Sequence, residues 1–485
     1  MRTIFAILAV HLLATPVFAQ DTGGFFDRLF GTDEAETDEE QGGLLEGFLE
    51  DNLSGEGRQV SVEGFRGALS GRATLDSLEI SDEQGVWLTL TDVVLDWNRS
   101  ALFRGRLEVT ELSAAEILLP RRPVAAEEGE TPVPEASGFS LPELPVSVAI
   151  DSINAERVAI GQPVFGTEAE VSVEGSLQLD DGEGAALLDL NKLDGSGAIR
   201  LDAAYSNQDE VLSLDLTVSE EADGIVAGLL DLPGRPAVDF SITGEAPISD
   251  YRADIRLATD GVERLSGSIQ TTTPENPEDG ALRILADLSG DIAPIFNPAY
   301  QPFFGPDVRL AARATTFADG SLDIDEIELS AASIRLNGTV RVGSDGVPRE
   351  IDIAGDIASD TGAVVLPLPG PETLVQRVDL DVEFDAAVSE LWSGNFLVTG
   401  LQRDGVSAER LALTGTGSIS SGDPASVSAT LDFEARALDL GDPEASEAVG
   451  EVVSGRARID WASGGPINLT DLEIDGESYG LEGSA

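Results

Sequence analysis

Carboxylates are the side chains with which this chain could do chemistry. The sequence has 89 Asp and Glu against 29 Lys and Arg, a formal net charge of -60 over 485 residues. It has no Cys, and its one His is His11, near the start of the chain. Thiolate catalysis, Cys-ligated zinc and a Ser-His-Asp triad are therefore not available to the rest of the chain. The charge would also repel the phosphates of nucleic acids, so we expect no nucleic-acid partner.

Three patterns resemble chemical sites and are better explained as structure. A pair of carboxylates could serve as the acid and base of a glycosidase, but here the acids alternate with apolar residues and are expected on a solvated face. Asp180 and Asp181 belong to neither an EF-hand loop nor a tandem calcium repeat. Gly415-Thr416-Gly417 lacks the rest of a dinucleotide-binding fingerprint. We expect no enzymatic activity, no cofactor and no metal, and we interpret the four tryptophans as strand-packing residues.

The first residues have the pattern of an export signal. Arg2 gives a positive start, Ile4 to Leu13 is apolar, and Val17-Phe18-Ala19 provides small or apolar residues for a signal peptidase. We interpret residues 1–19 as a signal peptide or signal anchor. The apolar stretch is short for a membrane span, which favours cleavage after Ala19. The chain is therefore expected in the periplasm or cell envelope, with anchoring to the inner membrane through the N-terminus as the alternative.

Two short segments follow the leader. Residues 20–43 contain the run DEAETDEEQ and are expected to form an acidic tether. Residues 44–57 place Leu44, Leu45, Phe48, Leu49 and Leu53 at helical spacing, which predicts a short amphipathic helix that ends at the glycines after it.

Most of the chain after residue 58 has the period of β-strands. Apolar and polar residues alternate, so that each predicted strand has one apolar and one carboxylate-rich face. Asp319-Gly320 and Asp345-Gly346 are typical hairpin turns. The apolar set that we expect to line one common interior is Val86, Leu88, Leu90, Leu212, Leu214, Leu216, Val378, Leu380, Val382, Phe384, Val427, Leu431 and Phe433.

The strand pattern has few interruptions. Residues 124–145 are rich in Pro and Glu and predict a loop between a β region at 58–123 and a second one at 146–485. Short helices are plausible at 222–232, 291–304 and 444–453. A series of β-sandwiches would show linkers about every 100 residues. Their absence favours a mostly β fold, a long amphipathic sheet curled into an extended groove, with about 28 strands after the loop.

Residues 58–123 resemble a known family. The ordered features are Val62-Glu63-Gly64, Gly67, Gly71, Leu78 with Ile80, Gly85-Val86-Trp87-Leu88, Leu95-Asp96-Trp97 and the stretch from Leu107 to Pro120. Together they resemble the N-terminal region of the TamB family, the inner-membrane component of the translocation and assembly module. The stretch from Asn297 to Val340 is similar to the family's mid-region. In the rest of the chain, from Leu44 to the C-terminus, the resemblance is limited to the general sequence pattern.

The resemblance implies a function. The family is expected to form a periplasm-crossing β-groove that supports outer-membrane protein assembly with an outer-membrane β-barrel of the TamA/BamA type. It is also similar to AsmA-like and bridge-like lipid-transfer proteins, which implies that phospholipid acyl chains are partners. Two features depart from the family, since the leader looks cleavable and no counterpart of the C-terminal domain precedes Ala485, as expected of a fragment. The alternative is an acidic extracellular adhesin or structural β-repeat protein.

Overall fold

A computed structural model describes residues 58–67, 71–102, 104–124, 147–274, 281–359, 362–421, 425–463, 465–476 and 479–484. The predicted leader, the acidic tether, the helix at 44–57 and all of the predicted 124–145 loop except Val124 lie outside these residues. None of the helices in the described part of the chain has the length and hydrophobicity of a membrane span.

The described chain is a single sheet of 26 strands with a few short helices. Its first half contains β1 (Gln59–Glu63), β2 (Arg72–Asp82), β3 (Gly85–Trp97), β4 (Arg106–Leu119), β5 (Ser147–Ile160), β6 (Ala169–Asp180), β7 (Glu183–Lys192), β8 (Gly197–Ser206), β9 (Val211–Glu220), β10 (Val238–Pro247), β11 (Asp250–Thr259), β12 (Val262–Thr272) and β13 (Leu282–Gly290). Its second half contains β14 (Val308–Thr316), β15 (Leu322–Ser330), β16 (Ile334–Val342), β17 (Pro348–Ala358), β18 (Val364–Val365), β19 (Thr373–Val375), β20 (Arg377–Asp385), β21 (Leu391–Arg403), β22 (Val406–Ser420), β23 (Ser426–Arg436), β24 (Val452–Ala462), β25 (Asn468–Asp475) and β26 (Gly480–Gly483).

The helices are all short. They are α4 (Arg99–Leu102), α5 (Gln162–Phe165), α6 (Ile225–Leu229), η2 (Ala293–Ile295), η3 (Pro298–Tyr300), α7 (Gln301–Phe304) and α8 (Pro443–Val449). The three helical interruptions predicted from the sequence are thus confirmed, at α6, at η2 to α7 and at α8. Asp442 caps α8 by accepting hydrogen bonds from the backbone N–H groups of Glu444 and Ala445, both at 2.9 Å.

Strands that follow one another in the chain pair side by side. Almost all neighbours are antiparallel, as in a series of hairpins, and β17 pairs directly with β20 around the small β18–β19 insertion. The exception is the parallel pair of β4 and β5, which requires the chain to cross back between residues 119 and 147. Within the described residues β1 pairs only with β2 and β26 only with β25, so the sheet has two open edges.

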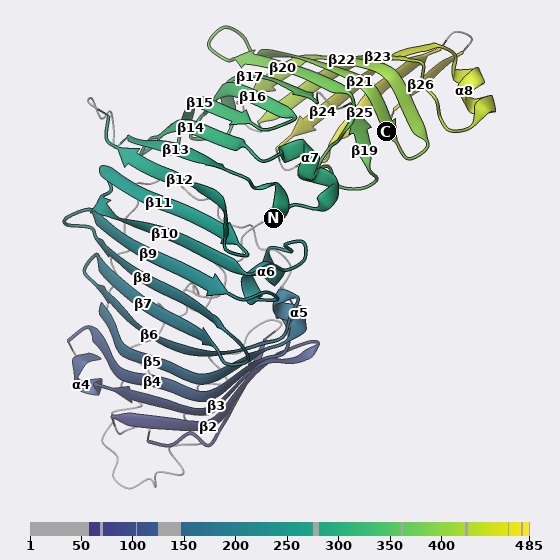
Figure 1. Cartoon of the computed structure of the whole chain (residues 1–485). Coiled ribbons are helices and arrows are strands. Elements are labelled where there is room, and N and C mark those ends of the chain that lie inside the picture. The colour runs from purple at the N-terminus through teal and green to yellow at the C-terminus, as the bar shows by residue number, and fades with distance from the viewer. Residues whose placement is uncertain are drawn as a thin grey trace.

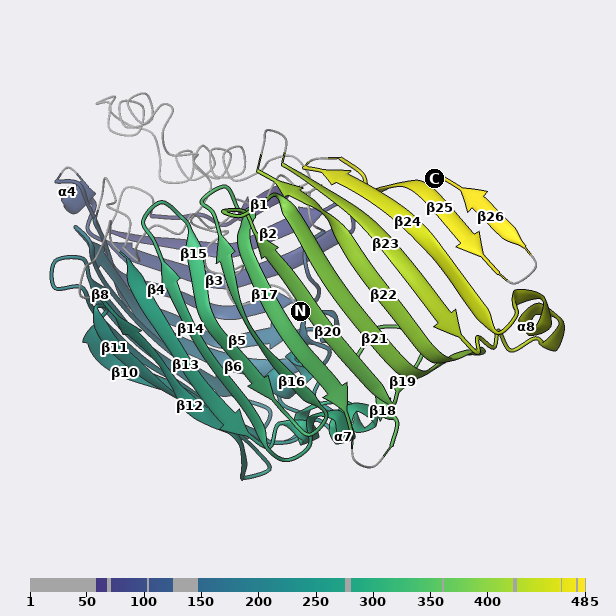
Figure 2. The same cartoon turned by 90° about the horizontal axis from the view of Figure 1, so that it is seen from above.

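The sheet is strongly bent. Strands β2 to β12 stack along one limb, and β13 to β26 turn away from it (Figure 1). Seen from above, β14 to β23 lie in front and β2 to β6 behind (Figure 2). The predicted curled amphipathic sheet is therefore confirmed, although the expected strand count was too high. β5 to β26 make 22 strands in the described chain rather than about 28, because many strands run to ten residues or more. At about 4.8 Å between neighbouring strands, the ladder without the β18–β19 insertion measures about 110 Å along its curve.

The two predicted hairpin turns are confirmed. Gly320 and Gly346 have φ values of 88° and 74°, a conformation that suits glycine. The Asp319 carboxylate accepts a hydrogen bond from the backbone N–H of Ser321 at 2.9 Å. The side-chain hydroxyl of Ser321 contributes most to holding the pKa of Asp319 below its usual value. These carboxylates are turn formers and are not free for chemistry.

Candidate functional site: the apolar face of the sheet

The strand register places the predicted interior residues of β9 on one face. Residues directly opposite each other in antiparallel strands point to the same side of a sheet. Leu216 faces Leu201 on β8 and Ile242 on β10, and Leu212 faces Tyr205 and Ala246. Leu214 lies between them on the same strand. The apolar side of β9 thus continues across both neighbours without a change of face.

The same ladder runs through β20. Val378, Leu380, Val382 and Phe384 face Ile357, Gly355, Ile353 and Ile351 on β17. On the other side they face Val398, Phe396, Gly394 and Trp392 on β21. The series continues across β22 to Val427, Leu431 and Phe433 on β23, which face Ile419, Gly415 and Leu413.

At the N-terminal end, the residues of β3 that lie on the apolar face change from even-numbered to odd-numbered positions. Leu88 and Leu90 face Ile80 and Leu78 on β2, but a register shift beside Ile80 pairs Val86 with Ser81 rather than with an apolar residue. Asp92 then has a φ of 50°, after which Val93 and Leu95 take over the apolar face. The pairing partners of these residues on β4 are also apolar, as Leu90 faces Ile117 and Leu95 faces Leu112. The reversal of odd and even apolar positions around Asp92 is visible in the sequence, but simple alternation does not anticipate it.

The burial of the predicted set is typical of a partly covered face. Phe384 and Val378 are buried, at 4% and 9% exposed, and Val86 is exposed at 39%. The remaining ten predicted residues are half-buried. A packed two-sheet core would bury most of them fully. The described residues contain one sheet only, so this apolar surface has no second sheet against it.

The opposite face carries acids paired with arginines. Examples are Arg377 with Asp379 at 2 residues' separation and Arg456 with Asp432 across β24 and β23 at 2.7 Å. The arginine holds the pKa of Asp379 below its usual value through a side-chain hydrogen bond. These pairs are largely exposed, and such pairs contribute little stability each. The predicted solvated carboxylate face is therefore confirmed, with arginines interleaved in it.

An aromatic side chain fills the space left by glycines on the apolar face. Trp392 lies across Gly415 and Gly417, and its Nε1–H donates a hydrogen bond to the Ser428 carbonyl at 3.0 Å. A Cβ at Gly415 would lie 2.7 Å from the indole ring, so a larger residue would displace it. Gly415-Thr416-Gly417 is thus part of strand β22, and Trp392 is a packing residue, as expected from the sequence.

The two long rims of the sheet differ. One rim, called here the roofed rim, carries α5, α6, η2 to α7, the β18–β19 insertion and α8 between its strands. The other, called here the plain rim, has short connections from β6 onward, such as 181–182, 207–210, 317–321 and 386–390. The sequence predicted three of the helical interruptions but not their alignment on one rim.

Two apolar clusters fix the roofed rim to the sheet. Ile225 of α6 packs with Ala169 and Val171 of β6, and Phe165 of α5 joins them. In the second cluster Ala227 and Leu232 pack with Val238 of β10, together with Leu257 of β11 and Ile295 of η2. Because these strand residues belong to the apolar face, the helices lie over that face. The helices also lie in the angle of the bend (Figure 1), so the apolar face is the concave one.

Neighbouring insertions on the roofed rim touch one another. The Arg235 guanidinium donates to the Gly166 carbonyl at 3.1 Å, which links the segment after α6 to the end of α5. Within the η2 to α7 insertion, Phe296 and Phe304 stack with ring centroids 4.1 Å apart. The Tyr300 hydroxyl lies 3.4 Å from the Leu368 carbonyl in the β18–β19 insertion. The insertions from α5 to β19 therefore form a row rather than separate decorations.

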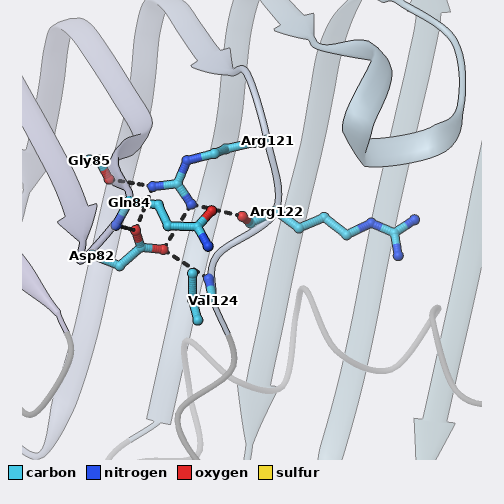
Figure 3. Close-up of polar contacts among 6 residues, drawn as sticks. All are labelled: Asp82, Gln84, Gly85, Arg121, Arg122 and Val124. Carbon is cyan, nitrogen blue, oxygen red and sulfur yellow. Dashed lines mark hydrogen bonds and ion pairs between the residues drawn. The ribbon is translucent and has the colours of Figure 1, made fainter.

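A buried ion pair fixes the start of this rim (Figure 3). The Asp82 side chain is 3% exposed and binds the Arg121 guanidinium, with the closest N–O distance at 2.5 Å. Its two oxygens also accept hydrogen bonds from the backbone N–H groups of Gln84 and Val124, both at 2.8 Å. Arg121 in turn donates to the Gly85 carbonyl. The pair joins the β2–β3 turn to the segment where the chain leaves β4 for its crossover.

Breaking this pair is expected to loosen the N-terminal strands. Arg121→Ala would leave the Asp82 carboxylate buried without its charge partner, which is costly. We expect amide exchange in the β2–β3 turn to accelerate by at least about tenfold. Hydrogen exchange measured by mass spectrometry checks this, with Arg104→Ala as the control, because Arg104 is exposed. Unchanged exchange in Arg121→Ala would contradict a fastening role.

The same pair predicts a pH dependence. The Arg121 side-chain hydrogen bond, with the backbone donors, holds the pKa of Asp82 well below its usual range. A lowered folded pKa stabilises the fold above the unfolded pKa, which is about 4 for Asp, and this stabilisation is lost as the pH falls toward the folded value. The difference between wild type and Arg121→Ala is therefore expected to be the same at pH 7 and pH 5 and to shrink below about pH 4.

No protein-family model, no curated protein and no solved structure matches this chain. The resemblance of residues 58–123 to the TamB family therefore rests on the residues quoted for it.

Proposed function

We propose that this protein is a TamB-like bridge of the cell envelope, which carries phospholipid acyl chains along the concave apolar face of its sheet. In doing so it supports outer-membrane biogenesis, with an outer-membrane β-barrel of the TamA/BamA type as the partner that the resemblance implies. The observation that carries the proposal is the continuous apolar ladder from Val60 and Val62 on β1 to Leu472 and Ile474 on β25.

The dimensions of this face suit acyl chains. It extends about 110 Å along the curve of the sheet, and large apolar faces that remain half-exposed to water mark interaction sites. Acyl chains are held by non-directional burial, which a face without polar pairing can provide along its whole length. Binding acyl chains requires no catalytic group on this face, and the carboxylates of the sheet lie on its opposite face.

The adhesin alternative predicts a different degree of burial for the apolar face. A structural β-repeat protein would bury that face in closed sandwiches, with most of its residues fully covered. The half-buried state of Leu212, Leu380 and Leu431 in a one-sheet structure favours a conduit over this alternative.

Native mass spectrometry of protein purified without detergent tests the proposal. The expected result is a series of masses in which the chain carries several phospholipids, because a face of this length accommodates more than one. Finding only the bare chain, from cells and after incubation with phospholipid vesicles, would overturn the lipid-conduit function. N-terminal sequencing of the same preparation would locate the processed end, expected after Ala19.

A further inference from the structure

A polar lipid headgroup would meet different surroundings at the two rims. On the roofed rim, the row from α5 to β19 covers the ends of the strands, and its apolar residues are buried. Ala227 has no exposed surface, and Phe303 and Leu232 are 4% and 7% exposed. A headgroup placed there would have to displace packed apolar side chains, which is unfavourable for a polar group. An acyl chain on the apolar face therefore has its polar end at the plain rim.

The plain rim is open and apolar at its turn tips. Val388, Ile467 and Leu391 are 82%, 74% and 67% exposed, the highest values among the exposed large hydrophobic residues of the described chain. All three belong to the plain rim, at the β20–β21 and β24–β25 connections. Val388 and Ile467 can contact the upper part of an acyl chain as it leaves the face, whereas Leu391 alternates with Trp392 and lies on the carboxylate face.

The charges of the plain rim have one sign. From β6 onward, the charged residues in the described plain-rim connections are all acidic, namely Asp181, Asp209, Glu210, Asp319, Asp345 and Glu390. Two nearby arginines already bind acids, because Arg349 binds Asp345 at 2.6 Å and Arg341 binds Glu350 at 2.6 Å. Arg283, at the start of β13, is half-buried and has an Nε without a hydrogen-bond partner. At the N-terminal end the plain rim also carries basic residues, with Arg66 in the β1–β2 connection and Arg99 and Arg104 in the β3–β4 connection.

We propose that the groove discriminates among lipids by headgroup charge, taking those that carry an ammonium group, such as phosphatidylethanolamine, and disfavouring those with a net negative headgroup. The inference rests on the proposed function. An ammonium group at the plain rim lies beside carboxylates, of which Asp345 alone, among the described connections from β6 onward, is already bound to an arginine. A net negative headgroup meets like charge at the described plain-rim connections. The arginine near them without an acidic partner, Arg283 on β13, is half-buried and lies within the strand rather than at a turn tip. These interactions are solvent-exposed and are screened over about 10 Å at 0.1 M salt.

Competition between two lipids measures this preference. Delipidated protein would be equilibrated with vesicles of equal parts phosphatidylethanolamine and phosphatidylglycerol with identical acyl chains, and its bound lipids identified by native mass spectrometry. We expect the ethanolamine lipid to be enriched about fivefold at low ionic strength, an effect of about 1 kcal/mol by the usual conversion. The enrichment should fall toward unity at 0.5 M salt because of screening.

Two outcomes of this experiment separate the proposals. Equal binding of the two lipids, or an excess of phosphatidylglycerol, at low salt would overturn the headgroup inference and leave the conduit intact. Binding of neither lipid would overturn the proposed function itself.

Matched charge variants test the placement of the headgroup. A plain-rim variant would combine Asp181→Asn, Asp209→Asn, Glu210→Gln and Glu390→Gln. A roofed-rim variant would combine Glu221→Gln, Asp231→Asn, Glu372→Gln and Asp404→Asn. All eight side chains are exposed, both variants remove the same charge, and Asn tolerates the left-handed backbone of residues 181 and 231.

The expected result is asymmetric. The plain-rim variant should lose most of the ethanolamine preference, while the roofed-rim variant keeps it. An equal loss in both variants would mean that the preference comes from overall charge, and a loss confined to the roofed-rim variant would place the headgroup on the other side; either result overturns the plain-rim assignment.

Discussion

Replacing Leu380 and Val382 together by Asp is expected to reduce the lipid that co-purifies with the protein by at least about tenfold. The two side chains lie side by side on the apolar face of β20, between Gly355 and Ile353 on one side and Phe396 and Gly394 on the other. A carboxylate there would have to share an apolar surface with acyl chains, without a basic partner. Burial of an unpaired polar group costs about 1–3 kcal/mol, enough to account for this loss.

The same strand offers the control. Asp381 and Glu383 lie between the inward positions and point to the carboxylate face, so Asp381→Ala with Glu383→Ala should leave bound lipid unchanged. Native mass spectrometry gives the lipid content, and circular dichroism checks that each variant is folded. Leu380→Ser is a milder inward change for the case in which the double Asp variant does not fold.

The outcomes decide between the two functions. Loss of lipid with the fold retained supports the conduit, and it should be accompanied by weakened outer-membrane integrity in cells. Equal lipid content in the inward and outward variants, with both folded, would mean that the apolar face is not a pathway. Unfolding of Leu380→Ser as well would favour a closely packed core and the structural alternative.

Alternation alone predicted the regular part of the sheet. Strands such as β9 and β20 keep strict period two, so the face of Leu214 or Val382 follows from sequence once one register is known. The hairpin turns at Gly320 and Gly346 were equally predictable, because Asp-Gly suits a tight turn with positive φ. These features depend only on neighbours in the chain.

The rest depends on contacts between distant segments. The change from even to odd apolar positions at Asp92 keeps Leu90 and Val93 on one face, and simple alternation does not say that β2 and β4 change with it. The parallel pairing of β4 and β5 cannot be read from either strand alone. The Asp82–Arg121 pair joins residues 39 positions apart, and each looks like an ordinary surface charge in the sequence.

Local sequence patterns also could not predict how the roofed rim packs against the sheet. A short apolar stretch such as Ile225 to Leu229 predicts a helix, but nothing in it says that it packs against Ala169 and Val171, which precede it by more than 50 residues. The acid that fastens this helix, Glu220, reads in the sequence as the last polar residue of an alternating strand. Period two puts it on the side of Leu216 and Val218, in agreement with its pairing with Val238, but its role as an acceptor for α6 depends on contacts outside the strand.

Glu220→Ala is expected to loosen the packing of α6, a part of the roofed rim, against the sheet. The Glu220 carboxylate is buried, with the residue 6% exposed, and accepts hydrogen bonds from the backbone N–H groups of Ile225 and Val226 at 3.2 and 2.8 Å. Its removal leaves one buried and one half-buried donor without that acceptor, at a cost of about 1–3 kcal/mol. Amide exchange across residues 225–232 should therefore accelerate by about tenfold or more, as measured by hydrogen-exchange mass spectrometry.

Two further variants show whether the acceptor or the charge matters. Glu220→Gln keeps one oxygen acceptor in place and should give an intermediate rate, because its amide nitrogen cannot accept a hydrogen bond. Glu221→Gln removes a charge from the exposed neighbouring residue and should leave exchange unchanged. One outcome is that amide exchange across residues 225–232 accelerates only in Glu220→Ala and Glu220→Gln, while exchange in the plain-rim turns stays unchanged. That result would show that α6 is held to the sheet independently of the plain rim. Identical exchange in all three variants would show instead that the apolar packing of Ile225 and Ala227 holds the roof without Glu220.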